Sequence, residues 1–74
     1  MQSSIGLLFT VDMAQAKGFT LIDEVLSSDE AQEHDARLYS KKTATGTLYV
    51  VTTGHFVTVV TSSEYLARIA LEKH

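Results

Sequence analysis

The stretch TLYVVTTGHFVTVVTS, residues 47–62, decides the fold of this chain. It contains two runs of β-branched and aromatic residues on either side of Gly54 and His55. Such residues fit a pleated surface, and a Gly-X pair suits a tight type II′ turn. We therefore predict a central β-hairpin with strands at 47–53 and 56–61.

The pairing of this hairpin assigns its side chains to two faces, and neither face is polar. A loop of two residues and a loop of four give the same assignment. One face carries Leu48, Val50, Val57, Val59 and Thr61, and the other carries Tyr49, Val51, Phe56, Thr58 and Val60. A sheet with one face in water alternates apolar and polar residues, so this hairpin must be covered on both faces, by helices or by another copy of the chain.

The chain is short, with 74 residues and no cysteine. This length indicates a single domain, 1–74. Small domains are usually stabilised by disulfides, a metal or a partner subunit, and the lack of cysteine removes the first of these. We therefore expect a protein partner, most simply a second copy in a homodimer.

The N-terminal residues share one feature, an apolar run, with a secretory signal. Residues 5–11 form an apolar run, but Asp12 interrupts it and no Lys or Arg precedes it, so we do not expect a secretory signal. No other apolar stretch approaches the roughly 18 residues of a membrane span. We expect a soluble, cytoplasmic protein with no membrane partner.

The residues before the hairpin predict elements that could cover it. Residues 4–11 resemble a largely buried strand. Asp12 offers an N-cap, and we predict a helix near 13–26 in which Gly18 is an interior residue. A strand over 19–26 is the alternative.

Two further capping boxes follow. Residues 27–30, SSDE, predict a second helix over 28–37, whereas residues 37–42 could instead be the first strand of a meander that leads into the hairpin. Residues 61–64, TSSE, predict a helix near 62–73. Its expected apolar stripe consists of Tyr65, Leu66, Ile69 and Ala70.

Together these elements predict an α+β fold. A small antiparallel sheet has the central hairpin 47–53/56–61 and extra strands near 4–11 and 37–42, and helices near 13–26 and 62–73 pack on it. The order strand, helix, three strands, helix resembles the double-stranded-RNA-binding fold in topology. That resemblance implies only a fold, because the basic residues and the loop histidine with which that family grips RNA have no counterpart here.

Charge bears on the choice of partner. The net charge is -3, and residues 12–35 hold seven carboxylates against one lysine. Nucleic-acid binders carry a basic face, so we expect no nucleic acid partner. Asp29, Glu30 and Glu33 could form an acidic surface that attracts a basic protein, although such runs are commonly just solvated.

Residues capable of chemistry are few. The histidines His34, His55 and His74 have no helical metal-site spacing and no cysteine accompanies them, so we expect neither a metal site nor a cofactor. His55 stands at the hairpin tip with a pKa naturally near neutrality. With Arg37 or Lys41 to hold a phosphate and Tyr49 or Tyr39 nearby, it could act as a general acid or base in RNA cleavage.

The Gly-His turn followed by Phe-Val-Thr-Val resembles the RNase toxins of bacterial toxin and antitoxin pairs. This resemblance implies a small metal-independent RNase that uses His55, Arg37 and Tyr49. We favour a non-enzymatic interaction module, an inhibitor or accessory protein that acts through a sheet or acidic surface. Its expected interface is the face with Tyr49, Val51, Phe56, Thr58 and Val60.

Overall fold

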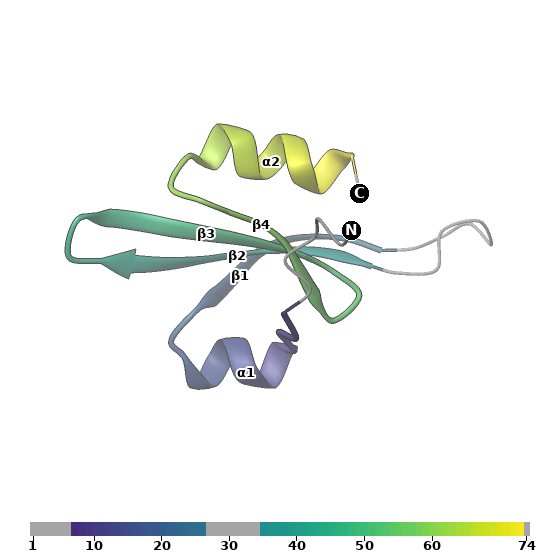
Figure 1. Cartoon of the computed structure of the whole chain (residues 1–74), viewed down its shortest axis with the longest axis horizontal. Coiled ribbons are helices and arrows are strands. Elements are labelled where there is room, and N and C mark those ends of the chain that lie inside the picture. Colours follow the sequence, from purple (N-terminus) through teal and green to yellow (C-terminus); the bar gives the residue numbers. More distant parts are fainter. Residues whose placement is uncertain (1–6, 27–34, 74) are drawn as a thin grey trace.

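The computed structural model describes residues 7–26 and 35–73. In chain order the elements are α1 (Val11–Ala16), β1 (Thr20–Val25), β2 (Ala36–Thr43), β3 (Gly46–Thr53), β4 (Phe56–Thr61) and α2 (Glu64–Glu72). The strands form one four-stranded sheet in the order β1-β2-β3-β4, with antiparallel neighbours. The sheet is the middle layer, with α2 on one side and α1 on the other (Figure 1). The predicted α+β class is confirmed.

The β3–β4 hairpin has the predicted two-residue turn. Thr53 pairs with Phe56, which leaves Gly54 and His55 as the loop. Gly54 has a φ of 63°, and none of the described non-glycine residues has a positive φ. A positive φ at the first loop position alone is the signature of a type II′ turn, and glycine adopts it without a Cβ clash.

A bulge in β4 changes the predicted faces of the hairpin. Val51 lies opposite Val59, but the next residue, Thr52, lies opposite Val57, so Thr58 is an extra residue in β4. One extra residue exchanges the faces of every side chain that follows it. The predicted faces are right for β3 and wrong beyond Thr58, because Val59 shares a face with Val51 and Val60 shares one with Val50.

Two hydrophobic clusters lie on opposite faces of the sheet. On the α2 face the buried residues are Ala36, Leu38, Val51, Ala67 and Leu71. On the α1 face they are Phe9, Ala14, Tyr39, Val50 and Val57, with Phe19 packed against them. The Phe9 ring meets Phe19 and Tyr39 edge to face, at centroid distances of 5.3 and 5.4 Å. The prediction that both hairpin faces are covered is confirmed.

The residues before α1 form less of a strand than predicted. Leu8 makes an isolated antiparallel bridge with Phe56, and the Phe9 amide donates to the His55 carbonyl at 2.7 Å. Residues 4–6 lie outside the described part of the chain. The N-cap of α1 is Thr10 rather than Asp12, since the Thr10 side chain accepts the Met13 amide at 3.2 Å.

The predicted helix 13–26 is wrong beyond Ala16. Gly18 has a φ of 85°, and the Phe19 amide turns back to donate to the Ala14 carbonyl at 2.9 Å. A left-handed glycine at this position ends a helix. The alternative strand over 19–26 is right, as β1 spans Thr20–Val25.

The strand alternative is also right for residues 37–42, which lie within β2. The predicted helix over 28–37 therefore fails at Arg37, and most of the remainder, including Asp29, Glu30 and Glu33, lies outside the described residues. Within the described residues the order is helix, four strands, helix. It differs from the predicted order that resembled the double-stranded-RNA-binding fold.

The C-terminal helix is confirmed, but it buries a different stripe. Ser63 is the N-cap and accepts the Leu66 amide at 3.2 Å, so α2 begins after the predicted cap Thr61. Ala67 and Leu71 are buried, with Ala70 packed beside them, at helical spacing. Tyr65 and Leu66 are 74% and 53% exposed, so the predicted stripe is wrong at these two positions and right at Ala70. α2 covers Leu38 and Val51, whereas Val50 and Val57 belong to the cluster on the α1 face.

Candidate functional site

The five residues of the predicted interface do not share one face. Val51 is fully buried beneath α2, and Tyr49 packs against the same cluster. Val60 lies on the α1 face and is 49% exposed. Phe56, 52% exposed, begins β4, and Thr58 occupies the bulge. The face predicted as an interface is thus divided between the two sides of the sheet.

The residues of the RNase hypothesis are also separated. Arg37 lies opposite Thr52, on the face with Val50, whereas Tyr49 lies on the α2 face. Tyr49 stands four residues before the end of β3, roughly 13 Å from the turn at about 3.3 Å per residue. The structure therefore does not bring His55, Arg37 and Tyr49 together.

Arg37 forms ion pairs with Glu24 and Asp35, and the charges of Arg37 and Glu24 affect the pKa of Tyr39. Its Nε lies 3.0 Å from Glu24 Oε2, and its Nη2 lies 3.6 Å from Asp35 Oδ2. Burial raises the pKa of Tyr39, while the charge of Arg37 lowers it and that of Glu24 raises it again. The net shift is upward, so the phenol stays protonated at neutral pH.

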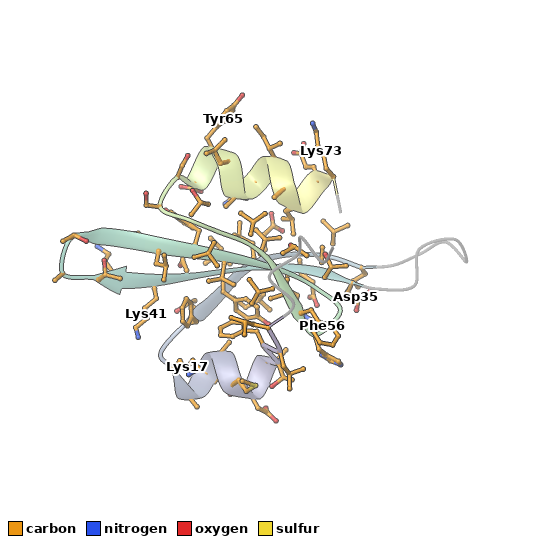
Figure 2. The ribbon with its side chains drawn as sticks, in the orientation of Figure 1. Lys17, Asp35, Lys41, Phe56, Tyr65 and Lys73 are labelled. Carbon is orange, nitrogen blue, oxygen red and sulfur yellow. The ribbon has the colours of Figure 1, made fainter. Side chains whose placement is uncertain are left out.

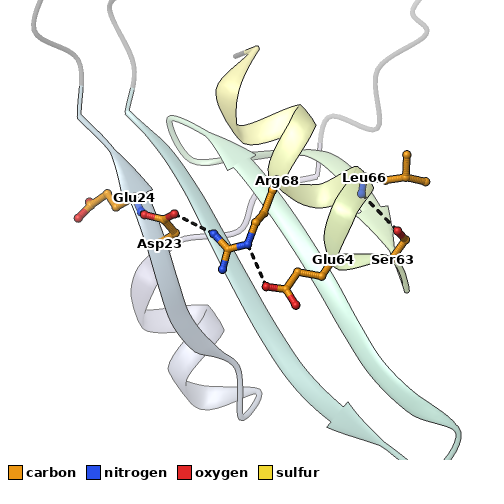
Figure 3. Close-up of polar contacts among 6 residues, drawn as sticks. All are labelled: Asp23, Glu24, Ser63, Glu64, Leu66 and Arg68. Carbon is orange, nitrogen blue, oxygen red and sulfur yellow. Dashed lines mark hydrogen bonds and ion pairs between the residues drawn. The ribbon is translucent and has the colours of Figure 1, made fainter.

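On the opposite side of the sheet, Arg68 of α2 links its own helix to the edge strand β1. Its Nη1 donates to Asp23 of β1 at 3.0 Å, and its Nε donates to Glu64 of α2 at 2.9 Å (Figure 3). The hydrogen bond to Glu64 is the main reason that the pKa of Arg68 is raised. These exposed pairs join an edge strand to a helix, and they engage the charges of Asp23, Glu64 and Arg68 with one another.

An apolar groove lies on the α1 face, and the sequence did not reveal it. Its volume is about 410 Å³. Its floor is formed by the core residues Phe9, Val50 and Val57. Its walls come from the N-terminal segment, α1 and its C-terminal turn, β3 and β4, through Leu7, Leu8, Met13, Phe19, Leu48 and Val60. The available signal was the surplus of apolar residues on this hairpin face, more than a helix of under two turns can cover.

Two lysines stand at one end of this groove. Lys17 lines it, and Lys41 Nζ lies 5.5 Å from the centroid of the Phe19 ring, which also lines it. A Cβ placed on Gly18 would lie 3.8 Å from Lys41 Cε, so the Lys41 side chain reaches the turn next to Lys17. Figure 2 shows Lys41 pointing from the sheet toward the α1 side. The ion pairs within the described residues involve Arg37 and Arg68, not these lysines.

Large apolar side chains are exposed at the β4 edge of the sheet, and three of the four, Leu7, Leu8 and Val60, also line the groove. Leu7 and Leu8 are 63% and 51% exposed, and Phe56 and Val60 are 52% and 49% exposed. The backbone bridge between Leu8 and Phe56 holds the two segments side by side. We call these four residues the β4-edge patch. Scattered exposed apolar residues are normal in a folded protein, whereas these four lie close together along one sheet edge.

The described residues contain neither a candidate metal cluster nor a candidate membrane-spanning helix. No group of three or more His, Asp or Glu side chains there could hold a metal ion. None of the helices in residues 7–26 and 35–73 is long and apolar enough to cross a membrane. Compared with protein families, with curated proteins and with solved structures, the chain matches none.

Proposed function

We propose that this protein is a small non-enzymatic interaction module that pairs with a second copy of itself through the β4-edge patch. The observation that carries this proposal is the exposure of Leu7, Leu8, Phe56 and Val60 along one edge of the sheet. Burial of one fully exposed side chain of this kind contributes on the order of 1.5 to 3 kcal/mol, and roughly half of each of these four is exposed and available for burial. Four from each chain are enough to offset much of the cost of association.

The backbone of β4 supports the same surface. β4 is the last strand of the sheet, and the N-terminal segment bridges only its start, at Phe56 and Val57. Among the described residues no strand pairs with the outer side of residues 58–61. An open edge flanked by apolar side chains is a template for strand addition, and a two-fold dimer would pair β4 with β4 antiparallel.

The hydrophobic core is divided into two small clusters, and this supports the proposal that a second subunit adds stability. Each face of the sheet has its own small cluster of five buried residues. No disulfide is available, because the chain has no cysteine. Domains of this size commonly gain stability from a second subunit.

Sedimentation velocity at tens of micromolar, roughly the range in which weak dimers appear, tests this proposal. We expect the wild type to sediment as a dimer and Phe56→Lys or Val60→Lys as monomers. Leu66→Lys is the matched control, since Leu66 is 53% exposed but lies on α2, and this variant should remain dimeric. A wild-type chain that is strictly monomeric, or a Leu66→Lys variant that dissociates equally, contradicts the proposal.

A further inference from the structure

We infer that the apolar groove on the α1 face binds the alkyl chain of a fatty-acid-like amphiphile, whose carboxylate lies at Lys17 and Lys41. The groove has a volume of about 410 Å³, within the usual range for small-molecule sites. The lysine end of the groove is separate from the β4-edge patch, because neither lysine belongs to that patch, whereas Leu7, Leu8 and Val60 are shared by the patch and the groove.

The apolar lining of the groove favours a ligand whose buried part is a hydrocarbon chain. Every residue that lines it except Lys17 is apolar. A buried polar group of a ligand would have no side-chain hydrogen-bond partner along this lining, and such burial costs free energy. An unbranched hydrocarbon chain has no group that needs such a partner, and each methylene it buries improves binding.

The two lysines at the end of the groove favour a ligand with an anionic head group. Lys17 lines the groove, and Lys41 reaches the same end by lying over the Phe19 ring. Neither ammonium has an ion-pair partner among the described residues. An anion at this end gains charge-assisted hydrogen bonds without first breaking an internal pair.

The carboxylates of Asp23, Glu24 and Glu64 are paired with arginines, so their charges should repel an anionic head group at Lys17 and Lys41 only weakly. Asp23 and Glu64 are paired with Arg68, which bridges β1 and α2 on the opposite side of the sheet. Glu24 is paired with Arg37 at 3.0 Å. The charge at the Phe19 end of the groove is therefore set mainly by Lys17 and Lys41.

Titration of the isotope-labelled full chain with decanoate, below the concentration at which it forms micelles, tests the inference by NMR. We expect saturable binding of one decanoate per chain, with amide shifts confined to residues that line the groove and to Lys41. Octanoate should bind more weakly and dodecanoate more tightly, by about fourfold per methylene until the groove is full. Decyltrimethylammonium, with the same tail and the opposite charge, should bind far more weakly.

Variants separate the head-group contact from general hydrophobic binding. Lys17→Ala and Lys41→Ala should each weaken decanoate binding by about fivefold, and Lys73→Ala, an exposed lysine at the end of α2, should not weaken it. Leu66→Lys, on α2, should leave the affinity unchanged, and Phe56→Lys should bind decanoate at least as tightly as the wild type, because it frees Leu7, Leu8 and Val60 from the proposed dimer surface. The inference is overturned by equal binding of the cationic amphiphile, or by binding only to vesicles of anionic lipid. It is also overturned if Phe56→Lys binds decanoate and the wild type does not, because a second copy would then occupy the groove.

Discussion

The hydroxyl of Thr58 donates a hydrogen bond to the carbonyl oxygen of Val51 at 3.1 Å, across the bulge in β4. The contact ties the extra residue of β4 to β3 at the point where the two strands change register. It thereby supports the exchange of faces that places Val59 under α2 and Val60 beside the groove.

Replacing Thr58 with valine keeps the shape of the side chain and removes the hydroxyl. We expect Thr58→Val to lower the free energy of unfolding by about 0.5 to 1.5 kcal/mol, the usual net value of one hydrogen bond. Thr58→Ser retains the hydroxyl and should lose less. Urea denaturation of the three proteins checks the order, and a valine variant as stable as the wild type would show that the bulge does not need this bond.

Leu71 and Leu66 lie on different sides of the same helix, which makes them a matched pair. Leu71 is 3% exposed and packs on the sheet, so Leu71→Ala should cost about 2 to 5 kcal/mol of unfolding free energy. Leu66→Ala should cost about 0.5 kcal/mol, because that side chain is 53% exposed. Chemical denaturation measures both, and the reverse order would restore the stripe predicted from the sequence.

Gly54 carries the left-handed backbone of the hairpin turn. Gly54→Ala should destabilise the protein by about 1 kcal/mol or more, because a Cβ is strained at its φ of 63°. His55→Ala, at the neighbouring loop position, serves as the control and should change the melting temperature little. Equal effects of the two substitutions in thermal unfolding would contradict a type II′ turn.

The raised pKa of Tyr39 leads us to expect that the free energy of unfolding falls at high pH. Its folded-state pKa is raised above the value of about 10 found in unfolded chains, chiefly by burial. The unfolded chain therefore releases the phenol proton first, and this contribution to stability is fully present below about pH 10 and declines as the pH rises further.

In Tyr39→Phe the alkaline decline should be shallower than in the wild type. Tyr65→Phe is the control, since that ring is 74% exposed, and it should keep the wild-type slope. Denaturation at a series of pH values between neutrality and strong alkali measures the three slopes. If Tyr39→Phe declines as steeply as the wild type, other groups account for the alkaline loss.

The elements that the sequence predicted correctly are those whose signals are local. The Gly54-His55 turn and the strands beside it depend on residues that are close in the chain, and so does the last helix, although its cap is Ser63 rather than the predicted Thr61. The helix predicted over 13–26 failed because its apolar spacing suits both a helix and a strand. The left-handed Gly18 ends the helix and makes room for β1.

The candidate sites depend on long-range placement, and the sequence could not supply it. Thr58 and Val59 each fit either face of a strand, so alternation alone does not mark a bulge between them. The groove forms because the N-terminal segment crosses the start of β4. Its charged end forms because the Lys41 side chain reaches Gly18, the residue next to Lys17. No local sequence pattern encodes either of these contacts, because each joins segments that are distant in the chain.

The two clusters share the same central strands, and neighbouring residues are divided between them. Leu38 and Val51 belong to the α2 cluster, whereas the adjacent Tyr39 and Val50 belong to the α1 cluster. Neither helix can therefore detach and leave an intact half-domain behind, and unfolding should be cooperative across the sheet. A single residue inserted into the middle of β3 would exchange the inward and outward roles of everything after it, so length changes are tolerable only in the connections between strands.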